Sequence, residues 1–249
     1  MKRLVLALLL WPAVAVAHPM GNFSVGQHAT LELARGNLSV RYVLDLAEVP
    51  TYQLRAAMFL EPAAAITQAD VELLREKSAR EWLGKLAVTL DGRPLALEAV
   101  SGRSALTPGA GGLPTVRFEI EARAAWEPTS GTPHALGYRD ANFPDRVGWK
   151  EVVVRAADGV TLASATAPSV DRTSALTKYP DQAAAAPLSV REANATFAVA
   201  AAAPAVGAPV QAAGTTAPGT SASDLQHAIL LILAYTLVLA AIAYAATRA

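Results

Sequence analysis

The stretch FSVGQHATLELARGNLSVRYVLDL, residues 23–46, decides the fold, because apolar and polar side chains alternate on both sides of one tight turn. If Arg35-Gly36 is that turn, each apolar residue faces another apolar residue across the two strands. The pairs are Leu33 with Leu38, Leu31 with Val40 and Ala29 with Tyr42. This match predicts an antiparallel hairpin with one buried face. It also places His28 opposite Val43 on the other, polar face.

The chain after this hairpin carries one helix signal and several strand signals. Thr67 and Asp70 resemble a capping box, and apolar residues then recur at helical spacing to about Gly84. Strand patterns occur at residues 86–90, 95–100, 116–121, 149–156, 160–165 and 188–199. Asp91-Gly92 is a hairpin signal, and Asp158-Gly159 is a second turn of the same kind. We expect about eight strands and one helix, in a mainly β, antiparallel, sandwich-like domain.

Both ends of the chain predict export and attachment to a membrane. The start has Lys2 and Arg3, then an apolar run, and closes with Ala15-Val16-Ala17, the small-x-small pattern that signal peptidase accepts. Residues 228–246 carry no charge over about 19 residues, which is enough to cross a hydrocarbon core of roughly 30 Å. Arg248 follows on the side that the positive-inside rule makes cytoplasmic.

These signals divide the chain into four parts. We expect a signal peptide at 1–17, an extracytoplasmic β-rich domain at 18–200, an Ala/Pro/Gly/Thr-rich linker at 201–223, and a transmembrane helix with a short cytoplasmic end at 224–249. The protein would then be a single-pass protein of the cytoplasmic membrane, anchored through residues 228–246, with its main domain in the periplasm.

Composition and missing motifs narrow the chemistry. The 249 residues include 21 basic and 21 acidic side chains, and this balance predicts no nucleic-acid partner and no acidic substrate. Because the chain has no cysteine, thiol chemistry and iron–sulfur ligation are excluded. No G-x-S-x-G, P-loop or H-E-x-x-H motif occurs, so nothing in the sequence predicts an enzyme.

The four histidines are the candidates for metal chemistry. Signal cleavage would make His18 the N-terminus, where its α-amine and imidazole can chelate one ion through two nitrogens. Pro19 blocks a square site along the backbone, so further ligands must come from elsewhere. The candidate helpers are His28 with Asp45, or His134 with Asp140 and Asp145. The predicted ligands are thus His18, His28 and His134, for a nickel, cobalt, copper or zinc ion; the alternative is that the histidines are ordinary surface residues.

A second candidate site is the stretch 131–148, predicted as a long loop. It concentrates aromatic and arginine side chains, together with Trp149 just after it. Such a loop suits either a recognition surface or a structural plug, in which the aromatic rings enter the core and aspartates pair with arginines. We favour the plug.

Five short stretches resemble the extracytoplasmic N-terminal domain that precedes the membrane part of some nickel/cobalt transporter (NicO-type permease) family proteins. The stretches are His18–Phe23, Arg41–Thr51, Gly111–Thr115, Gly148–Glu151 and Pro187–Arg191. The resemblance covers roughly residues 18–200. It implies an accessory role in metal transport, in metal capture, gating or assembly.

The chain departs from that family where the transport part should begin. In the transporters the first span continues into an H-A-L-x-P-G-H-G-K-like motif and further helices, whereas here a single span without that motif ends the sequence. One helix has no partner helices to line an ion path, so we expect a separate multi-span membrane permease as partner. The alternative function is a structural or protein-interaction module of the cell envelope that binds no metal.

Overall fold

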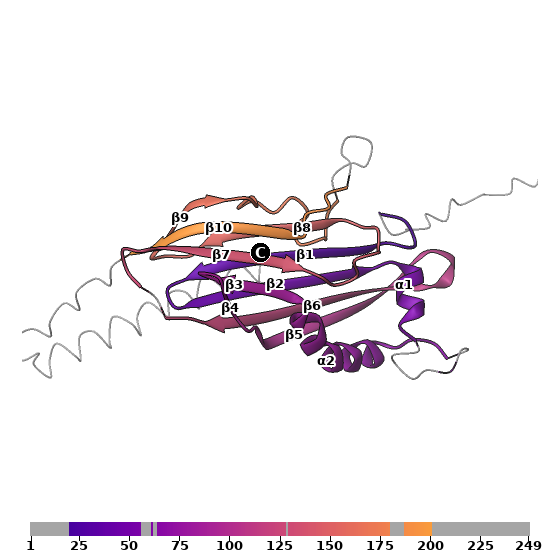
Figure 1. Cartoon of the computed structure of the whole chain (residues 1–249). Helices are drawn as coiled ribbons and strands as arrows, with labels where there is room; N and C mark the ends of the chain where they lie inside the picture. The colour runs from indigo at the N-terminus through magenta and orange to yellow at the C-terminus, as the bar shows by residue number, and fades with distance from the viewer. Residues whose placement is uncertain (1–19, 56–60, 62–63, 128, 180–186, 201–249) are drawn as a thin grey trace, which may run out of the picture. The chain divides into compact units, whose positions relative to one another are not determined.

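The structure is a computed structural model that describes residues 20–55, 61, 64–127, 129–179 and 187–200 (Figure 1). The predicted signal peptide, His18, the linker and the predicted transmembrane helix lie outside these residues. Within the part that is described, no helix combines the length and the apolar character that crossing a bilayer requires.

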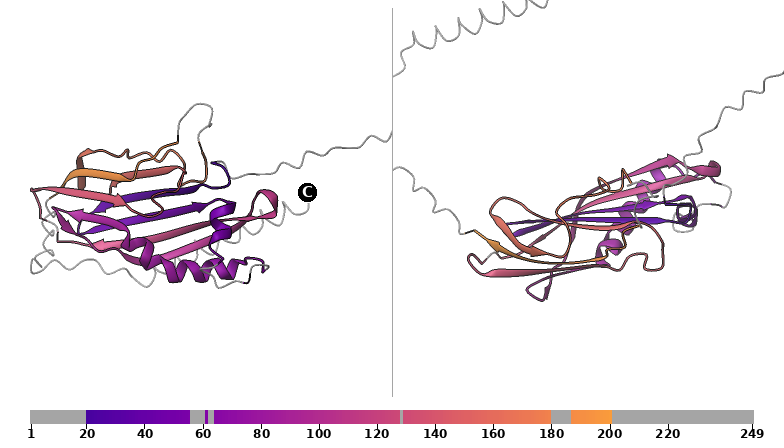
Figure 2. Two further views of the ribbon diagram at one scale, coloured as in Figure 1. Left: turned by 45° about the vertical axis from the view of Figure 1, so that its right-hand side comes forward. Right: turned by 90° about the horizontal axis from the view of Figure 1, so that it is seen from above.

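The strands of the described residues form two five-stranded sheets (Figures 1 and 2). The first sheet has the order β5-β6-β2-β1-β8, and the second has the order β4-β3-β7-β10-β9. The strands of the first are β1 (Val25–Ala34), β2 (Asn37–Leu46), β5 (Glu98–Pro108), β6 (Pro114–Ala125) and β8 (Lys150–Ala156). Those of the second are β3 (Leu86–Leu90), β4 (Arg93–Pro94), β7 (Pro133–Asp140), β9 (Val160–Ala165) and β10 (Glu192–Val199).

Helices are few in the described residues. They are α1 (Glu48–Gln53), α2 (Gln68–Gly84) and a single 3-10 turn, η1 (Ala110–Gly112). The predicted class, a mainly β and largely antiparallel sandwich, is therefore confirmed. Some details were wrong. The short helix α1 was missed, and β1 and β8 pair in parallel.

The predicted hairpin forms with its predicted register. Leu31 lies opposite Val40 and Leu33 lies opposite Leu38. These four side chains are fully buried and belong to one apolar core, to which both sheets contribute. The alternation of apolar and polar residues therefore predicted the buried face correctly, because a strand points successive side chains to opposite faces.

Helix α2 begins and ends close to the predicted positions. The Thr67 side chain accepts a hydrogen bond from the Asp70 backbone N–H, and the Asp70 carboxylate accepts one from the Thr67 backbone N–H, so the capping box is complete. The helix packs beside β5 (Figure 2). It buries Trp82, whose ring centroid lies 4.9 Å from that of Phe118 on β6.

Both predicted Asp-Gly turns form, but soon after each of them the chain enters the other sheet. The strand predicted at 95–100 forms only from Glu98 onward and does not pair with β3, since β4 ends at Pro94 and β5 starts at Glu98 in the other sheet. Proline lacks the N–H that would extend the β3–β4 ladder. Similarly, Asp158-Gly159 connects β8 of the first sheet to β9 of the second. Both turns thus lie near points where the chain crosses from one sheet to the other.

The outer face of the first sheet is covered around His28. The segment after β9 returns over it, and Ala175 and Leu176 pack against Val43 and Trp149 in a second small core. The contact is close: a Cβ at Gly26 would lie 3.0 Å from Leu176 Cδ1. His28 lies opposite Val43 on this face, as predicted, but it is buried because the segment covers it.

Candidate metal centre

His28 is a fully buried side chain without a hydrogen bond. It sits in the middle of β1, is 0% exposed, and neither ring nitrogen has a hydrogen-bond partner. Its Nε2 atom lies 3.4 Å from Oδ2 of Asp171. A buried polar group left without a hydrogen bond costs about 1–3 kcal/mol, and this ring has only the longer contact to Asp171.

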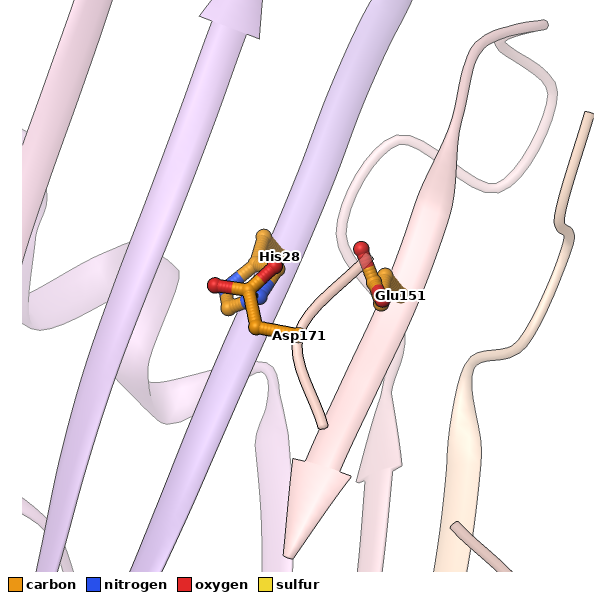
Figure 3. A group of neighbouring side chains, drawn as sticks. All are labelled: His28, Glu151 and Asp171. Atoms are coloured by element: carbon orange, nitrogen blue, oxygen red, sulfur yellow. The ribbon is translucent and has the colours of Figure 1, made fainter. Parts of the chain in front are cut away.

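Two carboxylates from elsewhere in the chain converge on this ring (Figure 3). Glu151 comes from β8, whose parallel register places it directly beside His28 on the same face. Asp171 comes from the segment that covers the sheet. One ligand atom from each of the three residues lies within 4.8 Å of the others. Among the described residues this is the one group of histidine and acidic side chains with that arrangement.

Backbone and hydroxyl groups orient both carboxylates. Glu151 accepts hydrogen bonds from the Arg172 N–H (2.8 Å) and the Thr173 hydroxyl (2.7 Å). Asp171 accepts from the Thr173 N–H (2.9 Å) and the Ala175 N–H (2.7 Å). Each carboxylate has about four lone-pair sites, so each retains acceptor capacity beyond these bonds. Supporting hydrogen bonds of this kind hold metal ligands in position.

The electrostatic surroundings favour a neutral imidazole. Burial lowers the pKa of His28 below its ordinary value of 6.5, and the charges of Asp171 and Glu151 oppose this shift. Arg41 and Arg117 on neighbouring strands add to the lowering. A neutral ring has a free lone pair on one nitrogen, which is the form that binds a metal ion.

The spacing of the three groups can be compared with that of a metal site. Two ligands about 2.1 Å from a tetrahedral ion lie about 3.4 Å apart. The His28–Asp171 contact already has this separation, and one ligand atom of Glu151 lies within 4.8 Å of one from each of these two residues. One imidazole with two carboxylates suits borderline and hard divalent ions such as zinc, nickel, cobalt and manganese, and does not suit copper(I).

The structure does not bring His134 to this site. His134 lies on β7 in the second sheet, with Nδ1 2.8 Å from Oδ2 of Asp91 and Nε2 3.0 Å from the Thr129 carbonyl. A carbonyl only accepts, so Nε2 donates to it, and the ring has no nitrogen directed at a third group. His134 as a ligand beside His28 is thus not supported by the geometry.

The other predicted helpers also have different roles. Asp45 accepts a hydrogen bond from the Tyr179 hydroxyl at 2.8 Å, and Asp140 accepts one from the Tyr42 hydroxyl at 2.9 Å. The sequence reading missed Glu151 and Asp171. Glu151 had a weak signal, because it alternates with the buried Val152 and Val154 along β8. Asp171 had none, since it lies outside any periodic element.

The stretch 131–148 is not one long loop, because it contains β7. Tyr138 and the neighbouring Trp149 are buried, and Phe143 packs against the main core. This agrees with the structural plug in its aromatic part. The acidic part differs: Asp140 is held by Tyr42, Gln27 and Asn142.

No protein-family model matches the chain, and no curated protein sequence matches it. The resemblance to the nickel/cobalt transporter domain therefore stays a prediction.

Proposed function

We propose that this protein is a membrane-anchored extracytoplasmic accessory domain of a nickel/cobalt-type transport system, and that it binds a divalent metal ion at His28, Glu151 and Asp171. The observation that supports this is the fully buried His28 ring, without a hydrogen bond, facing two oriented carboxylates. A divalent cation would supply the missing partner of the ring and balance the two negative charges. No other arrangement among the described residues offers a nitrogen and two carboxylate oxygens in this way.

The proposed role is metal capture, with a separate multi-span permease carrying the ion across the membrane. The apolar segment 228–246 would anchor the chain next to that partner. The segment after β9 covers the site. A covered site suits an ion that is first held and then passed on to the permease. The ion is the cargo of the system in this proposal.

Calorimetric titration of the purified full chain with nickel, cobalt, zinc and copper tests the binding. We expect one ion per chain, and we expect His28→Gln to weaken binding about 100-fold, since it removes the only nitrogen ligand. His134→Gln is the matched control and should change the affinity less than about 3-fold. Equal affinities for the wild type and His28→Gln would contradict the site.

A variant with one residue added before His18 distinguishes the two predicted metal sites. The His28 site predicts unchanged affinity, whereas a chelate of the His18 α-amine and imidazole predicts a loss. If no variant and no wild-type sample binds any of the four ions, the interaction-module function is favoured instead. Uptake of radioactive nickel by cells carrying the wild type or His28→Gln then tests the transport role.

A further inference from the structure

The segment that covers His28 contains an unusual backbone turn. Ser174, Ala175 and Leu176 have φ angles of 49°, 54° and 64°, so three consecutive side-chain-bearing residues adopt the left-handed conformation. This conformation is unfavourable for L-residues other than glycine. Such a turn persists only where surrounding contacts hold it.

The contacts that hold the turn use the proposed ligands. Asp171 accepts from the Ala175 N–H, while Glu151 accepts from the Thr173 hydroxyl, which in turn accepts from the Leu176 N–H. Further along the segment, the Tyr179 hydroxyl donates to Asp45 on β2. The same two carboxylates therefore hold this turn in place and form part of the candidate metal site.

Metal loading changes what these carboxylates can offer. An ion bound beside His28 would be shared with a Glu151 carboxylate that already accepts from the Arg172 N–H and the Thr173 hydroxyl. Both carboxylates also share charge with a bound cation, and a less negative oxygen is a weaker acceptor for the turn's donors. The closed segment and the bound ion thus draw on the negative charge of the same two carboxylates.

We propose that metal binding opposes the closed form of residues 171–179, in which this segment covers His28. Loading the ion loosens the segment, so the position of the segment reports whether the site is occupied. This inference rests on the proposed function and concerns the regulation of the same site. By thermodynamic reciprocity, any change that weakens closure without touching a ligand must strengthen metal binding by the same factor. If the closed segment were instead a preorganised part of the site, the same change would weaken binding.

Tyr179→Phe is the change that separates these outcomes. It removes the hydroxyl that fastens the segment to Asp45, and it leaves His28, Glu151 and Asp171 in place. Tyr52→Phe is the matched control, since Tyr52 lies on α1, away from the site, and is 47% exposed. In a calorimetric titration of the full chain with cobalt chloride, we expect Tyr179→Phe to tighten binding about 3- to 10-fold and Tyr52→Phe to leave it unchanged. Equal or weaker binding by Tyr179→Phe overturns the inference.

A measurement on the wild type keeps the test decisive if the variant fails to fold. Hydrogen exchange, followed by mass spectrometry of the peptide covering 171–179, should become faster when cobalt is added. Slower or unchanged exchange in a chain that binds cobalt overturns the inference and leaves the proposed metal site intact. Absence of cobalt binding by the wild type overturns both.

Discussion

His134 Nδ1 and Asp91 Oδ2 lie 2.8 Å apart, and this contact fastens β7 to the turn between β3 and β4. Asp91 also accepts the Ala135 N–H at 2.8 Å, so one carboxylate holds both a side chain and the backbone of β7. The Thr129 carbonyl accepts from the other ring nitrogen. Both nitrogens can donate at the same time only in the protonated ring, so these two contacts favour the imidazolium form of His134.

The first prediction is that the His134–Asp91 contact makes the stability of the fold depend on pH. The hydrogen bond to Asp91 raises the pKa of His134 above its ordinary value, and His134 with Arg93 nearby holds the pKa of Asp91 below its ordinary value. The His134 contribution is therefore full below about pH 6.5 and is lost as pH rises through the raised pKa of the folded state. The Asp91 contribution is present above about pH 4 and is lost as pH falls further.

Thermal melts of the wild type and His134→Gln at about pH 5.5 and about pH 8.5 check this prediction. His134→Gln should lower the melting temperature, relative to the wild type, by more at the lower pH, where the wild-type ring is charged. His28→Gln serves as a comparison, because His28 makes no such hydrogen bond. A difference that is larger at the higher pH would show that His134 is not held as an imidazolium.

The second prediction concerns the hairpin that the opening stretch of sequence encodes. Val40 is fully buried between Leu31 on β1 and Ala122 on β6. Val40→Asp places an unpaired charge in the core and should destabilise the protein by several kcal/mol. The same change at the exposed Val100 on β5 should stay within about 0.5 kcal/mol. Denaturant unfolding measures both, and similar midpoints for the two variants would contradict this packing.

The third prediction concerns Gly148, which lies just before β8 and close to the backbone of Val25. Gly148 has a φ of 143°, and a Cβ there would lie 2.2 Å from the Val25 carbonyl oxygen. Gly148→Ala must therefore push β1 and the start of β8 apart, at an expected loss of about 2 kcal/mol or more. Gly84→Ala, where a Cβ meets nothing within 4 Å, should be neutral or slightly stabilising. Equal unfolding midpoints for the two alanine variants would rule out the close contact.

Gly148→Ala also bears on the candidate metal centre. Val25 and the residues that follow it lead directly to His28, while Gly148 leads to Glu151. A shift between these strands should separate the two ligands. We therefore expect weaker metal binding in this variant than in Gly84→Ala under the same titration.

Local patterns predicted the local structure well. The β1–β2 register, the capping box of α2 and the two Asp-Gly turns each depend on residues a few positions apart. Alternating side chains and turn residues specify such features because the interacting groups are already neighbours along the chain. The same reasoning placed His28 correctly on the face opposite the core.

The sequence by itself determined these hairpin and helix elements, and the presence of an imidazole on that face. Only the tertiary structure decided that the face is covered and that Glu151 and Asp171 meet His28 there. The parallel pairing of β1 with β8 and the return of residues 171–179 join parts of the chain that are far apart in sequence. Pairings of this kind depend on how two sheets share a core after the chain crosses repeatedly between them, and no short-range pattern encodes that choice.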